Sequence, residues 1–187
     1  MNVVVSRYQE NIDWADGIEN GIIYNKGPTT PVSRHPVITL PNVGREGHTY
    51  LYHIIQNYDQ LPDHTCFLQG HPFDHTPDLE HRLQTFDRSL SFFSLSRVHA
   101  INLCYDPTDF SLHPLLIETY ARVFGKSKIN HEFTFGAGAQ FIVSRDAIHS
   151  RPRSFYENLL QIMEYSVHPP EGFALERFWT MIFTGGE

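Results

Sequence analysis

The chain has 187 residues, of which 41% are hydrophobic and 19% are charged, as in ordinary soluble globular proteins. The formal net charge of -7 leaves no general basic field, which argues against a nucleic-acid-binding protein. This length favours one domain with a sizeable core, so we expect a single domain over residues 1–187.

The first half of the chain alternates short strands with one clear helix. The β-branched run Val3–Val5 predicts a buried parallel strand, because a strand covered on both faces needs no apolar alternation. Apolar residues at helical spacing from Tyr50 to Tyr58 predict a helix. Two prolines in residues 71–77 predict an irregular loop. The expected strands or extended runs of this half cover residues 3–5, 21–27, 37–41 and 65–70.

The second half carries more helices, and its last segment is strongly aromatic. Strands are expected over residues 99–105 and 140–143, whereas residues 89–96 are ambiguous. The expected helices cover residues 78–86, 114–124, 154–165 and 173–183. Alternating strands and helices indicate an α/β domain with a mostly parallel central sheet flanked by helices.

Cys66 and Cys104 lie in apolar runs, and we expect two buried free thiols and a reducing compartment. The N-terminal MNVVVSRYQE has too short an apolar segment for a signal peptide. No run of about 18 apolar residues predicts a membrane span. We therefore expect a cytoplasmic protein.

The ends of the predicted strands carry the first candidate ligand contacts. Arg7 and Tyr8 follow the opening strand, and ligands of α/β proteins bind where strands end and loops begin. Asn42, Gly44 and Arg45 precede the helix, where free backbone N–H groups and an arginine suit a phosphate. The alternatives are a solvated loop charge at Arg7 and a simple glycine turn at Gly44.

The loop after the strand at residues 65–70 is rich in metal-binding side chains. His71, Asp74 and His75 are imidazole and carboxylate ligands that suit a divalent metal. Gln69 and Gly70, at the strand end, are better placed to contact a neutral ligand. The alternative for the loop is a solvated turn, since no zinc signature is present.

Glu176 is a lone acidic residue in the apolar, aromatic segment ALERFW. Burial of a carboxyl group favours its neutral form, which suits it for proton transfer. Arg177 beside it allows an ordinary ion pair as the alternative.

Motifs along nearly the whole chain resemble a family of small proteins of unknown function found in fungi, bacteria and large viruses. The motifs are VVVSRYQENIDW, LPNVGREGHTYLYHII, YDQLPDHTCFLQGHPFDH, GAQFIVSRDAI and GFALERFW.

A looser resemblance links the chain to GT-A-type glycosyltransferases, which use nucleotide-sugar donors. The segment FGAGAQFIVSRDAI is similar to the glycine-rich acceptor segment of the Fringe and β-1,3-galactosyltransferase group. This resemblance implies a GT-A-like arrangement in which Arg7 and Tyr8 lie near the nucleotide. It also implies that the Asn42–Arg45 segment lies near the donor and that Glu176 is the catalytic base.

The chain departs from these enzymes in having no Asp-x-Asp motif after the central strand. Either Asp74, with His71 or His75, holds Mn²⁺ or Mg²⁺, or the protein is metal-independent or has lost transfer activity. No organic cofactor is expected.

These observations predict a glycosyltransferase that transfers a sugar from a nucleotide-sugar donor to a glycan or another hydroxyl acceptor. One alternative is a metal-dependent hydrolase built on His71, Asp74, His75 and His81. A second alternative is a carbohydrate-binding or interaction protein with a non-catalytic site.

Overall fold

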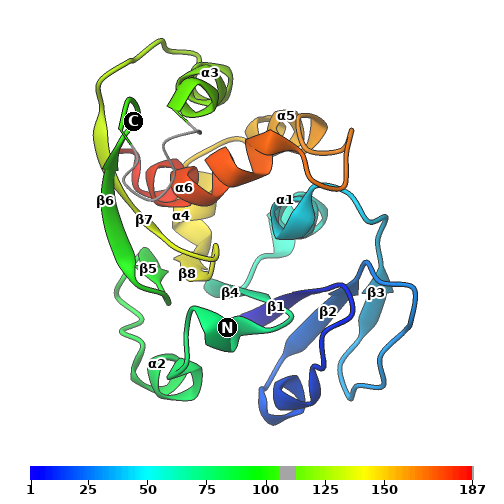
Figure 1. The fold of residues 1–187 in the computed structure, drawn as a ribbon. Helices are drawn as coiled ribbons and strands as arrows, with labels where there is room; N and C mark the ends of the chain where they lie inside the picture. The colour runs from blue at the N-terminus through cyan, green and yellow to red at the C-terminus, as the bar shows by residue number, and fades with distance from the viewer. Residues whose placement is uncertain (106–112, 187) are drawn as a thin grey trace.

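The computed structural model describes residues 1–105 and 113–186 and shows one α/β unit built on a six-stranded sheet (Figure 1). The strand order is β3-β2-β1-β4-β8-β5. A two-stranded sheet of β6 and β7 stands beside it. The strands are β1 (Asn2–Arg7), β2 (Gly21–Asn25), β3 (Val37–Thr39), β4 (His64–Gln69), β5 (Phe92–Ser94), β6 (Val98–Asn102), β7 (Glu132–Gly136) and β8 (Phe141–Ser144).

The first four strands are parallel, as the β-branched opening run predicts. Val4 of β1 lies between Ile22 of β2 and Phe67 of β4. The run from Val3 to Val5 is buried on both faces of the sheet, which explains its lack of polar alternation. The sequence prediction of a mostly parallel central sheet is confirmed.

The other edge of the sheet is antiparallel. β8 runs antiparallel to β4, and β5 runs antiparallel to β8. The ambiguous residues 89–96 contain β5, which is only three residues long. β7 was not predicted as a strand, because its glycine-containing segment suggested only a close backbone approach.

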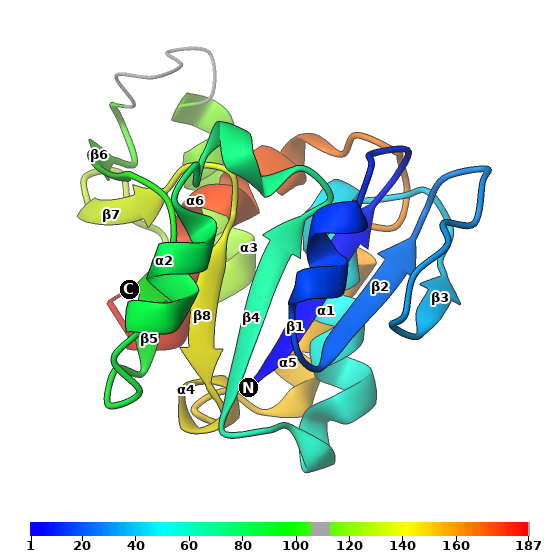
Figure 2. The ribbon, with the colours of Figure 1, turned by 90° about the horizontal axis from the view of Figure 1, so that it is seen from below.

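Helices cover the sheet unequally on its two faces. Behind the sheet in Figure 2 lie α1, α5 and α6, while α2 and the short 3₁₀ helix η1 lie in front. The α-helices are α1 (Arg45–Asn57), α2 (Leu79–Thr85), α3 (His113–Phe124), α4 (Arg145–His149), α5 (Arg153–Gln161) and α6 (Pro170–Thr184). The 3₁₀ helices are η1 (Asp13–Gly17), η2 (Tyr58–Gln60) and η3 (Pro72–Asp74).

The larger core lies between the sheet and the helices α1 and α6. The ring of Tyr50 on α1 lies 4.9 Å from that of Phe67 and 6.2 Å from that of Trp179 on α6, measured between ring centroids. Phe141 of β8 contacts the same rings from the sheet side. Aromatic pairs at these distances add to the stability gained from burial. The apolar segment predicted to dock on the core is therefore α6.

One cysteine differs from its prediction. Cys66 is buried in β4, as expected, but Cys104 is exposed. β6 ends at Asn102, and Cys104 lies in the following turn, where its backbone N–H donates to the Asn102 side chain at 3.1 Å. The apolar run there continues past the end of the strand.

Within residues 1–105 and 113–186, none of the helices combines the length and apolar character needed to cross a membrane.

Candidate functional site

A polar cleft of about 570 Å³ opens where β1, β2 and β4 end. Since the chain moves from β1 outward to β2 and β3, then returns to place β4 on the other side of β1, the order of strands reverses at β1 and β4. Ligands of open α/β sheets bind at this kind of crevice. Seven predicted site residues line the cleft, namely Arg7, Tyr8, Asn42, Arg45, Gln69, His71 and Asp74.

Arg7 lies at the back of the cleft with its guanidinium group already bonded to protein. It donates to the side chain of Asn25 at 2.6 Å and to the backbone carbonyls of Glu10 and Thr29 at 2.9 and 2.7 Å. The side chain is buried. Arg7 therefore fixes two loops around the cleft.

Tyr8 and Glu10 form the next part of the rim. One carboxylate oxygen of Glu10 accepts from the backbone N–H of Tyr8 at 2.6 Å and packs against Gly70. A Cβ atom at Gly70 would lie 2.6 Å from that oxygen, so a larger residue there would have to displace the Glu10 carboxylate. The Tyr8 ring stays 44% exposed at the mouth of the cleft.

The segment before α1 forms an unusual turn. Gly44 and Arg45 have φ angles of +63° and +51°, in the left-handed region. This conformation is costly for a residue with a side chain, and such strain clusters at functional sites. A Cβ atom at Gly44 would lie 2.8 Å from the backbone oxygen of Met163. The predicted glycine turn therefore exists, and it is packed against α5 and its following loop.

Lys26 is hydrogen-bonded to the backbone of this turn. Its Nζ donates to the carbonyl oxygens of Val43 and Arg45, both at 2.5 Å. Burial lowers the pKa of Lys26 to about 7, while the carboxylate of Glu46 acts in the opposite direction. A buried lysine with a lowered pKa facing a cleft is a mark of a functional site.

Glu46 faces the same cleft from the first turn of α1. Burial raises the pKa of Glu46, Arg45 lowers it, and the nearby carboxylate of Glu176 raises it further. The Arg45 guanidinium lies 3.6 Å from the Glu46 carboxylate and 4.6 Å above the Phe173 ring of α6. These contacts join the start of α1 to α6 at the floor of the cleft.

Glu176, the predicted base, does not line the cleft itself but lies behind Glu46. Its carboxylate accepts from the backbone N–H of Gly138 at 2.6 Å and lies 3.7 Å from the Arg177 guanidinium. Arg177 therefore lies beside Glu176 as a charged neighbour, as in the ion-pair alternative of the sequence analysis. The hydroxyl of Tyr50, buried beside the two glutamates, has no hydrogen-bond partner within the described part of the chain.

The loop from His71 to His75 divides between two places. His71 and Asp74 face the cleft, 3.5 Å apart, and their side chains are 53% and 78% exposed. The His75 ring instead lies over Gly138, where an added Cβ atom would approach it to 2.3 Å.

The loop does not bring its three candidate metal ligands, His71, Asp74 and His75, to one place. In residues 1–105 and 113–186, no three His, Cys, Asp or Glu side chains are grouped to hold a metal ion. Pro72 begins the 3₁₀ turn η3 (Pro72–Asp74), and this turn directs the side chains of His71 and His75 to different places.

The model of the family described as "Protein of unknown function (DUF3431)" matches residues 3–187. The chain belongs to this family. The resemblance to an uncharacterised family is confirmed. No curated protein matches the chain. No solved structure matches it either. The family description names no activity, so the functional argument for this DUF3431 protein rests on the cleft.

Six residues that line the DUF3431 cleft are not among the predicted site residues, namely Ser6, Glu10, Lys26, Glu46, Val167 and His168. Lys26 is the residue directly after β2, and the strand-end rule that selected Arg7 would have found it. Glu46 directly follows the predicted Arg45 in the first turn of α1. Val167 and His168 line the cleft from the loop between α5 and α6, and no local pattern marks them.

Proposed function

We propose that this protein is a glycosyltransferase that transfers a sugar from a nucleotide-sugar donor to an acceptor hydroxyl. The observation that carries the proposal is the gathering of seven predicted donor and metal residues in one cleft at the ends of β1, β2 and β4. A volume of about 570 Å³ lies within the usual range for small-molecule and cofactor sites, roughly 300–1,000 Å³.

Different residues of this cleft are assigned to different parts of the donor. The exposed ring of Tyr8 offers a stacking surface for the base, and Arg45 is a cation in the cleft for the diphosphate. Asn42 and Gln69 supply uncharged hydrogen-bonding groups for sugar hydroxyls. Arg7, whose donors are bonded to loop oxygens, supports the cleft instead of binding the donor directly.

Mn²⁺ or Mg²⁺ fits this arrangement only as an ion shared with the donor. Mg²⁺ is commonly held by one or two carboxylates together with substrate phosphates and water. Asp74 supplies one carboxylate in the cleft, with the His71 ring 3.5 Å from it, and both side chains are exposed to the ligand. Such an ion would neutralise charge on the departing diphosphate.

Glu176, which lies outside the cleft lining but keeps 19% of its side chain exposed, acts as the base for the acceptor. The acceptor hydroxyl gives its proton to the Glu176 carboxylate while its oxygen forms a bond to the anomeric carbon of the sugar. The bond from that carbon to the diphosphate oxygen breaks, and the electron pair leaves with the nucleoside diphosphate. The Gly138 N–H and Arg177 hold the carboxylate in place for this transfer.

The test begins with binding. Nucleotide-sugars with UDP, GDP, CMP and dTDP are screened by thermal shift with and without Mn²⁺, because a ligand of the folded state raises the melting temperature. Transfer is then measured with the donor that binds. Glu176→Gln should bind the donor normally and lose about 10²- to 10⁴-fold in transfer rate.

The matched control is Glu157→Gln, on the exposed surface of α5, where Glu157 pairs with Arg153. It should keep the wild-type transfer rate. A Glu176→Gln protein as active as the wild type removes the assigned base. A folded protein that binds none of the nucleotide-sugars overturns the transferase itself.

The hydrolase alternative required His71, Asp74, His75 and His81 to converge on a metal. His75 lies over Gly138, and no group of three such ligands is found in the described part of the chain. No observation therefore favours the hydrolase. A non-catalytic carbohydrate-binding protein differs from the proposed enzyme in binding a sugar without turnover, which the same transfer assay reports.

A further inference from the structure

We propose that Lys26 is the residue of the cleft that binds a phosphoryl group of the ligand, through an ammonium donor left available by its two backbone contacts. This inference deepens the proposed function and rests on it for the identity of the complete ligand. The sequence analysis had placed a phosphate at Asn42, Gly44 and Arg45 instead.

The three cations of the cleft differ in how far protein groups already use them. Arg7 donates to a side chain and to several loop carbonyls, and it is buried behind the rim. Arg45 lies over the Phe173 ring and beside the Glu46 carboxylate. Both arginines have contacts that hold the walls of the cleft together.

Lys26 differs from the two arginines in how many of its donors are already bonded to protein groups. Only 7% of its surface is exposed, and its Nζ donates to the carbonyl oxygens of Val43 and Arg45. An ammonium group has three donors, and these two are its acceptors within the described part of the chain. The ammonium form therefore has one donor beyond these two contacts, and Lys26 is one of the residues that line the cleft.

The burial of Lys26 gives phosphoryl binding a measurable signature. Since burial lowers the pKa of Lys26 to about 7, part of the free protein carries a neutral amine near neutral pH. An oxyanion beside Nζ stabilises the ammonium form, so binding should take up a proton. Arginine at the same position stays charged and should take up none.

Other titratable groups near Lys26 also contribute to the pH dependence of ligand binding. The contribution of Lys26 is therefore measured as a difference between two proteins. The carboxylates of the cleft are Glu10, Glu46 and Asp74, its other cations are Arg7 and Arg45, and the nearby histidines are His48, His71 and His168. The proton uptake that belongs to Lys26 is the part lost in Lys26→Arg.

The experiment is calorimetric titration of the full chain with inorganic pyrophosphate, in two buffers of different ionisation enthalpy. The wild type should take up roughly half a proton more than Lys26→Arg at pH 7, and about 0.9 more at pH 8. Ionisation of pyrophosphate itself is common to both proteins and cancels in the difference.

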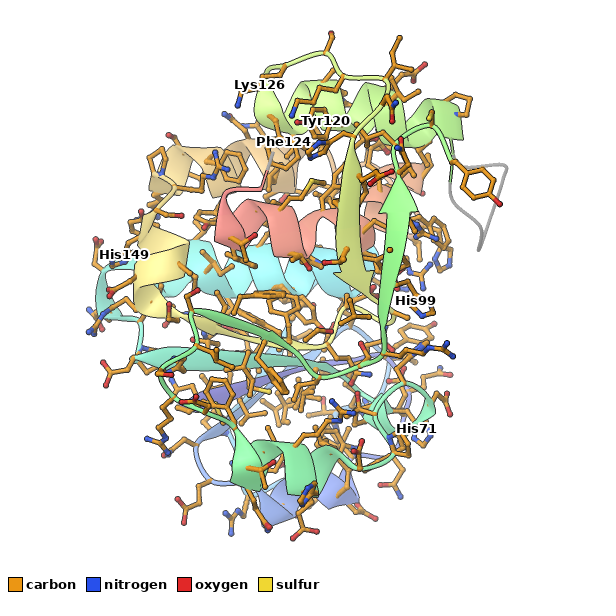
Figure 3. The ribbon with its side chains drawn as sticks, turned by 90° about the vertical axis from the view of Figure 1, so that its left-hand side faces the viewer. His71, His99, Tyr120, Phe124, Lys126 and His149 are labelled. Carbon is orange, nitrogen blue, oxygen red and sulfur yellow. The ribbon has the colours of Figure 1, made fainter. Side chains whose placement is uncertain are left out.

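Lys26→Met removes the donor and should weaken pyrophosphate binding at least about tenfold, as expected for a lost charge-assisted hydrogen bond. The control is Lys126→Met, at the opposite end of the molecule from His71 of the cleft (Figure 3), which should bind like the wild type. If Lys26→Met fails to fold, the comparison of the wild type with Lys26→Arg still decides.

Equal proton uptake in the wild type and Lys26→Arg would overturn the inference, as would a folded wild type that binds no pyrophosphate. Parallel titrations with UDP-sugars separate the two proposals. Lys26-dependent pyrophosphate binding without binding of any nucleotide-sugar would support the phosphoryl site and overturn the transferase.

Discussion

The floor and the loop wall of the cleft both carry charged side chains, but burial from solvent shifts pKa values only on the floor. The floor of the cleft consists of Lys26, Arg45 and Glu46, where burial shifts the pKa of both Lys26 and Glu46. The loop wall from His71 to Asp74 is rich in titratable groups but remains open to solvent. Desolvation, more than the number of titratable residues, therefore marks the chemically unusual part of the site.

The largest expected effect is on stability at acidic pH, and it compares the buried histidines of α1 with the exposed histidine of the loop wall. Burial lowers the pKa values of His48 and His53 on α1 to about 4. His48 is therefore neutral near pH 7, and its 3.8 Å approach to Glu164 is not an ion pair there. Between about pH 4 and 6.5 the unfolded chain binds more protons, so stability is lost as the pH falls through this range.

We expect a loss of up to about 4 kcal/mol between pH 6.5 and 4.5, measured by urea unfolding at each pH. His53→Gln should remove part of this dependence, whereas His71→Gln, on the exposed loop, should follow the wild type. An identical pH profile for His53→Gln and the wild type would show that burial on α1 does not govern acid sensitivity.

The second prediction tests whether close packing against Met163 holds the glycine turn before α1. Gly44→Ala combines left-handed strain with a 2.8 Å approach to the Met163 oxygen and should cost about 3 kcal/mol. Gly125→Ala has a similar φ of +64° and no atom within 4 Å, so it should cost only about 1 to 2 kcal/mol. Denaturant unfolding measures both; equal losses would mean that the contact at Gly44 is relieved without cost.

The third prediction concerns Lys26 in the absence of ligand. Its folded pKa of about 7 lies below the unfolded value of 10.5, so the unfolded chain binds more protons between these values and stability rises with pH. The unfolding free energy should increase by about 1 kcal/mol from pH 7 to 8. Higher pH is avoided, because burial also raises the pKa of the Cys66 thiol.

Lys26→Met, which cannot titrate, should lose this increase, while Lys126→Met should keep it. Urea unfolding at pH 7 and 8 gives the comparison. The assignment fails if the increase persists in Lys26→Met.

The smallest effect is expected on the loop wall. His71→Ala breaks an exposed contact with Asp74 and should change the unfolding free energy by less than about 0.5 kcal/mol. The same variant should weaken donor binding in Mn²⁺ if the pair holds the ion. A large stability loss would show that the loop wall is part of the folded core, against the contrast drawn above.

Local patterns determined much of the fold. The run Val3–Val5 predicted a buried parallel strand, and the helical spacing around Tyr50 and Ile54 predicted α1. Ser144 caps α4 through a bond from Ala147 N–H, as its residue type suggests. These features depend on neighbours in sequence, so periodicity and residue type are enough to predict them.

Only the tertiary structure decided which polar residues form the floor of the cleft. The chain alone predicted that Arg7, Asn42 and Arg45 lie at strand and helix ends, and the fold brings them together with Lys26. It also separates His75 from His71, although only three residues lie between them. Residue types and spacing by themselves determined the candidate ligands and most of the secondary structure, but not β7 or the short strand β5. Desolvation is summed over β2, α1 and α6, which lie far apart in the sequence, so only their packing decides which charge is buried.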